Sequence, residues 1–232
     1  IGGDRSHHRP QKDRRIGLEK FTVLTGVAAP LLRRNIDTDA IIPGKELRNV
    51  EKGGLADGLF GQWRYLDGDR KENPDFVLNQ PPYRDAVILL ADENFGCGSS
   101  REGAVWALTG FGIRCVIAPS FASIFYNSSF KNGLLPVILA QEEVYEIADQ
   151  VEKHGGRAPV SVDLITCSVT DPGGGQYTFR VNDLYRQMLL EGLDQIDATL
   201  RYEQNIVDFQ EKDRISRPWV YEYQTKDRIA IS

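Results

Sequence analysis

Cysteine is scarce in this sequence, with three residues among 232. Cys97, Cys115 and Cys167 form no C-x-x-C pair, and their odd number argues against both a disulfide framework and a structural zinc site. Cys115 and Cys167 fall within apparent strands far apart in the sequence, whereas Cys97 lies between two glycines. We therefore expect the first two to be buried small hydrophobic side chains rather than metal ligands.

Histidine is equally scarce. His7 and His8 lie in a segment without apolar periodicity, and His154 lies in a glycine-rich loop. The predicted core therefore has no imidazole to activate a serine, which argues against a hydrolase triad.

Long apolar runs and an excess of basic residues are also missing. No run approaches the length that spans a bilayer, and the first residues lack the apolar core of a signal peptide. The formal net charge is −5 and no basic patch recurs, which argues against nucleic acid as a partner. We expect a cytoplasmic protein that binds neither membranes nor nucleic acid.

The chain is long enough for one large domain with a substantial core. Residues 1–18 are rich in arginine and lack apolar periodicity, so we expect a disordered arm, either native or left by cloning. Residues 19–232 then form the folded domain, with helices and a tail at the carboxyl end.

The most informative stretch is 86–107, AVILLADENFGCGSSREGAVWA. The apolar run 86–91 is typical of a strand covered on both faces, and a second such run follows at 114–118. Gly96 and Gly98 suit a tight turn. Ser99 with Glu102 matches a capping box, which predicts a helix over about 100–109. Together these elements predict a βαβ unit with parallel strands.

Ser99, Ser100 and Arg101 are expected at the carboxyl end of that sheet, where α/β folds bind ligands. Amides of a helix's first turn and a guanidinium both favour an anion, in particular a carboxylate. The alternative is that the serines only cap the helix. A dinucleotide loop is excluded because Arg101 stands where the third glycine belongs, and because no ribose-binding acid follows the next strand.

The motifs NFGCGSSRE and SFASIFYNSSFKNGLLPV, with DTDAIIP before them, resemble the swivelling domain of the aconitase superfamily, most closely the small subunits of isopropylmalate isomerases. The resemblance runs from Phe21 to Trp219. It implies an α/β fold: a layered β/β/α swivelling domain with a mostly parallel sheet, βαβ units and a helical segment at the carboxyl end. It further implies a hydro-lyase of leucine biosynthesis that interconverts 2-isopropylmalate and 3-isopropylmalate through 2-isopropylmaleate.

The resemblance also assigns roles to individual residues. Ser99 would take the proton, Ser100 and Arg101 would bind a substrate carboxylate, and Asp39 would face the substrate. Residues 44–50 resemble the loop that separates substrates in this family. Leu47 is the candidate apolar contact for an isopropyl group, and Arg48 would point to solvent or meet an additional carboxylate.

By the same resemblance, a [4Fe-4S] cluster supplies the Lewis acid. This chain has no ligand set for it, so we expect a large partner subunit to carry the cluster while this chain binds no cofactor. The family usually has histidine where Gly103 stands here, which leaves the exact malate-type acid open; citramalate and dimethylmalate are alternatives. A non-catalytic dicarboxylate-binding module is the alternative from another functional class.

Local patterns predict further elements along the chain. Residues 35–39 are expected to form an Asx-turn before a strand at 40–42, and Ser120 to cap a helix over 121–131. Two alternating segments within 159–181 predict a hairpin, followed by a helix capped by Asn182 or Asp183. The last predicted helix covers 194–211, and Trp219 is expected to dock the tail onto the domain.

Overall fold

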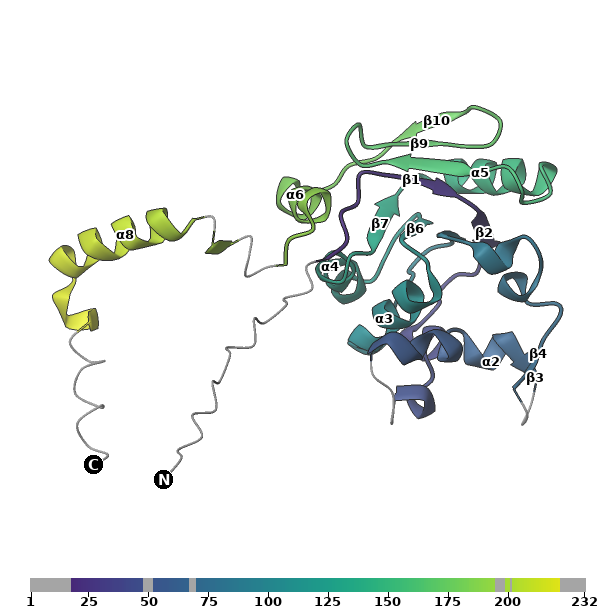
Figure 1. The fold of residues 1–232 in the computed structure, drawn as a ribbon, viewed down its shortest axis with the longest axis horizontal. Coiled ribbons are helices and arrows are strands. Elements are labelled where there is room, and N and C mark those ends of the chain that lie inside the picture. Colours follow the sequence, from purple (N-terminus) through teal and green to yellow (C-terminus); the bar gives the residue numbers. More distant parts are fainter. Residues whose placement is uncertain (1–17, 48–51, 67–69, 195–198, 201, 222–232) are drawn as a thin grey trace, which may run out of the picture.

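The structure is a computed structural model that describes residues 18–47, 52–66, 70–194, 199–200 and 202–221 (Figure 1). The predicted arm therefore lies outside the described residues, apart from Leu18. Two four-stranded sheets form the centre of the molecule, one parallel and one antiparallel. None of the described helices is long and apolar enough to cross a membrane.

The parallel sheet has the order β2-β5-β6-β7 and is built from the predicted apolar runs. Its strands are β2 (Ala28–Leu31), β5 (Ile88–Ala91), β6 (Cys115–Ala118) and β7 (Leu135–Ile138). Every residue of β5 and β6 is buried, as expected for strands covered on both faces. The crossovers between them are α3 (Glu102–Phe111) and α4 (Ser123–Lys131), which confirms the predicted βαβ units.

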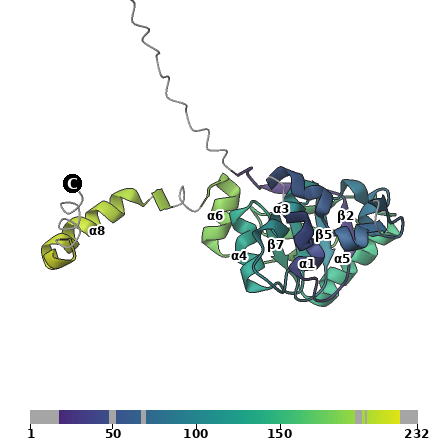
Figure 2. The same ribbon diagram turned by 90° about the horizontal axis from the view of Figure 1, so that it is seen from below.

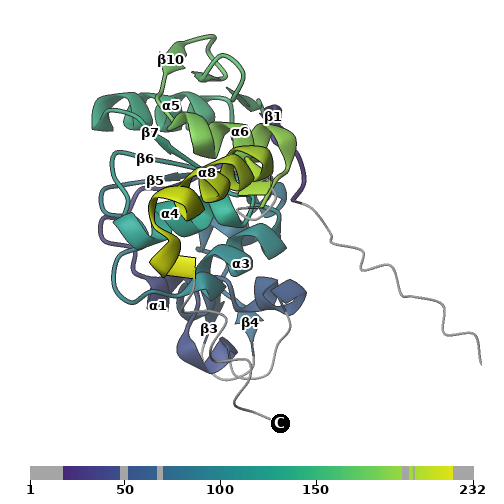
Figure 3. The same cartoon turned by 90° about the vertical axis from the view of Figure 1, so that its left-hand side faces the viewer.

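The antiparallel sheet has the order β1-β8-β9-β10. It joins β1 (Val23–Gly26) to the predicted hairpin region, which contains β8 (Val160–Asp163), β9 (Ser168–Thr170) and β10 (Gln176–Thr178). Helix α5 (Gln141–Lys153) lies on the side of the parallel sheet that faces the antiparallel sheet (Figure 3). The layered arrangement with a mostly parallel central sheet is confirmed.

Two apolar cores follow from these layers. On one face of the parallel sheet, Leu89 and Val116 pack with Ala104 and Leu108 of α3. On the other face, side chains of β5 and β6 pack with those of α5 and of the antiparallel sheet. Because alternate residues of one strand serve the two cores, the short strands need no polar face.

Short elements cover the first core between β2 and β5. They are α1 (Thr38–Ile41), the 3-10 helices η1 (Gly44–Leu47) and η2 (Lys52–Gly58), α2 (Gly61–Arg64), the two-residue strands β3 (Tyr65–Leu66) and β4 (Lys71–Glu72), and the 3-10 helices η3 (Val77–Asn79) and η4 (Tyr83–Asp85). The strand predicted at 40–42 is wrong, because the Asp37 side chain accepts a hydrogen bond from the Ala40 amide at 2.7 Å and so begins helix α1.

Both predicted serine caps are wrong. Helix α3 begins at Glu102 with Arg101 in the cap position, and no side chain caps it. Helix α4 begins at Ser123, while the Ser120 hydroxyl accepts a hydrogen bond from the Asn94 amide at 2.8 Å. Each serine is thus engaged by a neighbouring segment of the chain rather than by its own helix.

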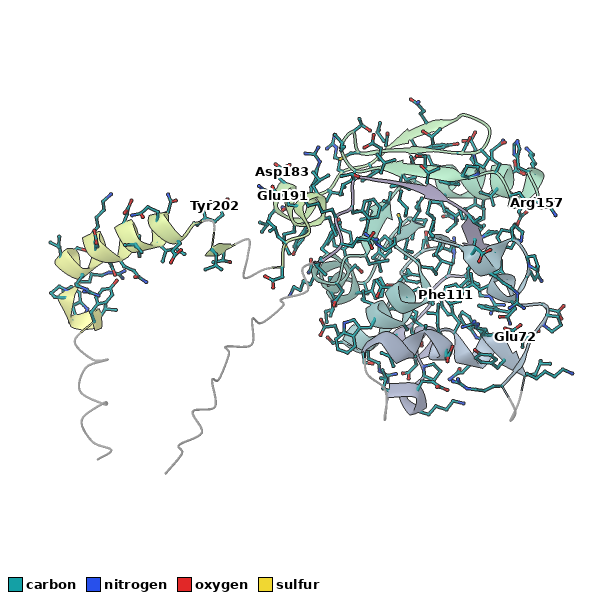
Figure 4. The ribbon with its side chains drawn as sticks, in the orientation of Figure 1. Glu72, Phe111, Arg157, Asp183, Glu191 and Tyr202 are labelled. Carbon is teal, nitrogen blue, oxygen red and sulfur yellow. The ribbon has the colours of Figure 1, made fainter. Side chains whose placement is uncertain are left out.

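The carboxyl end differs most from expectation. Helix α6 (Asp183–Glu191) is capped by Asn182 as predicted. Helix α8 (Glu203–Ser216) stands apart from the body in two perpendicular views (Figures 1 and 2). Tyr202 marks its near end in Figure 4. Trp219 is 64% exposed, so the predicted docking of the tail is wrong.

Candidate functional site

The turn between β5 and α3 is fixed between two other segments beyond the carboxyl ends of the strands. On one side the Gly96 amide donates to Ile36 O at 2.7 Å, and Cys97 O accepts from the Thr38 amide at 2.9 Å. On the other side Phe95 exchanges backbone hydrogen bonds with residues 120–122 at 3.0 to 3.1 Å. The turn is therefore held by backbone bonds that do not depend on its exposed side chains.

Gly96 and Gly98 are both required by the turn. Their φ angles are +74° and +88°, a region that other residues rarely adopt. A Cβ at Gly96 would also lie 2.2 Å from Cγ of Phe125, so the ring can pack there only because the side chain is missing. The predicted glycine turn is confirmed, and α4 supplies its packing partner.

The side chains that follow the turn meet helix α1. The Thr38 hydroxyl donates to the Ser99 carbonyl at 3.0 Å, and the two hydroxyl oxygens lie 3.4 Å apart. Arg101 pairs with Asp39 and also donates to the Ile42 carbonyl at 3.4 Å. The side chain of Arg101 is 25% exposed and that of Asp39 is 57% exposed. Two residues predicted for substrate binding are thus brought into contact across 62 positions of sequence.

These groups open into a cavity of about 320 Å³. Its lining combines the predicted site residues with side chains of α1 and α4: Thr38, Gly96, Ser99, Ser100, Arg101, Glu102, Ile124, Phe125, Asn127, Ser128 and Lys131. The first turn of α3 lies at this cavity, where its partial positive charge adds to that of Arg101. The cavity can therefore hold a small anion beside two serine hydroxyls.

Sequence reasoning missed the wall contributed by α4. Ile124, Ser128 and Lys131 recur at helical spacing and line the cavity from one face of that helix. The sequence predicted a helix over 121–131, but not that Ile124 on it is 56% exposed. The sequence signal that could have indicated this wall is an apolar side chain, a hydroxyl and a cation at helical spacing, Ile124, Ser128 and Lys131.

The remaining predicted site residues lie elsewhere. Leu47 is half-buried, packs against the first core and does not line the cavity. Arg48 lies outside the described residues. Substrate contacts by these two residues stay predictions.

The three cysteines differ in their surroundings. Cys115 is buried in β6, as predicted, and burial raises the pKa of its thiol. Cys167 lies in the turn between β8 and β9 with a φ of +54°, so its predicted strand position is wrong. Burial and the charge of Asp37 raise the pKa of the Cys97 thiol. Among the described residues, no group of three or more His, Cys, Asp or Glu side chains could hold a metal ion.

Comparisons with known proteins place the chain in a family. The family model described as the aconitase C-terminal domain matches residues 18–142. The small subunit of 3-isopropylmalate dehydratase from Cupriavidus necator is 54% identical over 205 residues, which cover 88% of this chain and 99% of that one. The subunit of the same name from Paramagnetospirillum magneticum is 53% identical over 203 residues, covering 88% of this chain and 100% of its own.

A solved structure extends the likeness to three dimensions. The crystal structure of 3-isopropylmalate dehydratase from Methanocaldococcus jannaschii superimposes with a TM-score of 0.58 at 28% identity, and the match covers 81% of this chain and 99% of that one. Identity above one half in sequence and nearly full coverage of these relatives show the family. The chain belongs to the family of 3-isopropylmalate dehydratase small subunits, within the aconitase superfamily.

Proposed function

We propose that this chain is the half of a hydro-lyase that binds a substrate carboxylate and moves a proton, in the interconversion of 2-isopropylmalate and 3-isopropylmalate. The observation that carries the proposal is the cavity at the start of α3, which joins Ser99, Ser100 and Arg101 in a chain of this family. The reaction belongs to leucine biosynthesis, a pathway we expect in the cytoplasm.

The carboxylate is bound by Arg101 and Ser100. A guanidinium offers two parallel N–H groups that match the two oxygens of a carboxylate, and such charge-assisted bonds are about twice as strong as neutral ones. Asp39 pairs with Arg101 and sets the direction of its side chain. When substrate binds, its carboxylate would take the place of Asp39 on the Arg101 guanidinium or bind beside it.

Ser99 is the group that takes the carbon-bound proton. A serine hydroxyl is a weak acid, so its deprotonated form needs positive potential at a fixed position. The neighbouring guanidinium and the first turn of α3 supply that potential on this chain. The Thr38 hydroxyl, 3.4 Å from the Ser99 hydroxyl, orients it from the other side of the turn.

The hydroxyl that leaves the substrate needs a Lewis acid. The described residues do not fit a cluster of their own, because no set of three ligating side chains exists among them. We infer that a large partner subunit carries a [4Fe-4S] cluster and closes the cavity from its open side. The small-subunit names of the relatives support a partner of this kind.

The test is co-expression with the large subunit of a 3-isopropylmalate dehydratase, followed by copurification and an assay with reconstituted cluster. We expect the two chains to copurify and to turn over 2-isopropylmalate faster than citramalate or dimethylmalate. If the pair prefers citramalate or dimethylmalate, that acid and not isopropylmalate is the substrate. Tight binding of isopropylmalate by the isolated chain, without turnover by the pair, would instead indicate a binding module.

A further inference from the structure

The missing side chain of Gly103 leaves a notch in the first turn of α3. A Cβ built there would lie 2.6 Å from Cδ2 of Leu47, closer than van der Waals contact allows. Leu55 of η2 lies 3.7 Å from the same point. Leu47 therefore packs onto the helix backbone at a place that any larger residue would fill.

A second notch receives the same segment. A Cβ at Gly58, in η2, would lie 2.6 Å from Cδ1 of Ile42 and 2.8 Å from Cβ of Glu46. The carboxylate of Glu46 is also held by Arg70 at 2.6 Å. The segment 42–47 is thus fixed by side chains that enter two glycine positions on neighbouring elements.

This segment and helix α1 directly before it carry the partners of Arg101. The Ile42 carbonyl accepts a hydrogen bond from the guanidinium, and Asp39 forms the ion pair with it. The Cβ position of Gly44 lies 3.9 Å from Nη1 of the same guanidinium. A shift of the segment would therefore move the groups that set the direction of Arg101.

We propose that Gly103 and Leu47 are positioning residues: Leu47 docks in the notch at Gly103 and, through segment 39–47, holds Arg101 in its carboxylate-binding orientation. This inference rests on the proposed function. It assigns Leu47 a role different from direct contact with an isopropyl group, and it gives the missing side chain at position 103 a structural role in this chain. The roles differ in outcome, because a displaced clamp weakens every dicarboxylate, whereas a lost apolar contact weakens only those with an apolar branch.

The experiment uses the co-expressed pair and compares Gly103→Ala with Gly110→Ala. Gly110 lies in the same helix, but a Cβ there meets Ala56 at an ordinary 3.6 Å, so the control carries the general effect of alanine in α3. For Gly103→Ala we expect the KM for 2-isopropylmalate and the inhibition constant of malate to rise together, about fivefold or more, while kcat changes less than twofold. Adding Leu47→Ala to Gly103→Ala should return both constants to those of Leu47→Ala alone.

If Gly103→Ala has the same KM for 2-isopropylmalate and the same inhibition constant of malate as Gly110→Ala, the proposal is wrong. Leu47→Ala gives an independent readout if Gly103→Ala folds poorly: we expect it to weaken malate and isopropylmalate alike, and weakening of isopropylmalate alone would overturn the positioning role. A wild-type pair without turnover would contradict the proposed function instead, so the two failures are distinguishable.

Discussion

The two strand-to-helix connections at the cavity differ in length and in task. Residues 92–101 connect β5 to α3, and residues 119–122 connect β6 to α4. The first carries Ser99, Ser100 and Arg101 with both serines exposed. The second is shorter and carries Phe121, whose ring lies 6.1 Å from that of Phe95.

The difference shows how the fold separates chemistry from support. The second connection holds the first by backbone bonds to Phe95 and by the Ser120 hydroxyl on the Asn94 amide. Helix α4 adds the Phe125 ring, 5.3 Å from that of Phe95 and against Gly96. This support uses no side chain of Ser99, Ser100 or Arg101, so a ligand can contact these side chains without loosening the turn.

Removing one serine hydroxyl from each connection compares the two directly, and the largest expected effect, on kcat, is that of Ser99→Ala. Ser99→Ala in the assembled pair should lower kcat by about 10²- to 10⁴-fold, the usual contribution of a general base, with assembly unchanged. Ser120→Ala should keep kcat near wild type and lower the free energy of unfolding by about 1 kcal/mol, since it removes one hydrogen bond. Equal turnover in the two variants would remove Ser99 from the proton step.

A smaller loss is expected when the guanidinium is replaced but its charge is kept. Arg101→Lys retains a cation without the planar pair of donors, and hydrogen bonds to charged groups contribute about 1.5–3 kcal/mol. We expect the KM for 2-isopropylmalate to rise about 10- to 100-fold. Lys131→Met, on the supporting helix, is the matched loss of a cavity cation, and a larger effect there would reverse the assigned roles.

The contact between the connections can be tested by stability alone. Gly96→Ala introduces both a positive-φ alanine and a clash with Phe125, so we expect the free energy of unfolding to fall by about 3 kcal/mol. Gly98→Ala adds a Cβ 3.4 Å from that of Asp37 and should cost about 1–2 kcal/mol, mainly from its φ. Equal losses in chemical denaturation would show that the Phe125 contact contributes little.

The smallest effect concerns two thiols, Cys97 in the turn before α3 and Cys115 in β6. Burial and the Asp37 charge raise the pKa of the Cys97 thiol, so less thiolate is present at neutral pH than in an unfolded chain. Alkylation of Cys97 should therefore be slow at pH 7, accelerate as the pH rises, and be faster in Asp37→Asn. Cys115, fully buried, should stay unlabelled in the native chain, and mass spectrometry of labelled peptides distinguishes the two.

The sequence allowed prediction of the parts of this site that depend on local pattern. The runs that form β5 and β6 are apolar on both sides, and the turn needs glycine, so both were readable from neighbouring residues. The caps were not readable, because Ser120 bonds to Asn94 from another segment. Asp37 gives the same local pattern for an Asx-turn and for a helix cap, and only packing decides.

The α4 wall was missed for a related reason. Lys131 and Ile124 become site residues only when α4 lies beside α3, a relation that no local pattern contains. The docking of Leu47 at Gly103 is likewise a contact between distant segments. The motif resemblance predicted roles for single residues, but it did not predict these contacts between distant segments.

Helix α8 is the part of the structure least tied to the rest. Its apolar side chains Ile206, Phe209 and Ile215 are exposed, and among the described residues neither core nor cavity includes a side chain beyond Leu190. Deleting the chain after Leu193 would remove this appendage and leave every cavity wall intact. A change in the length or sequence of this carboxyl end would accordingly leave the turn between β5 and α3 as it is.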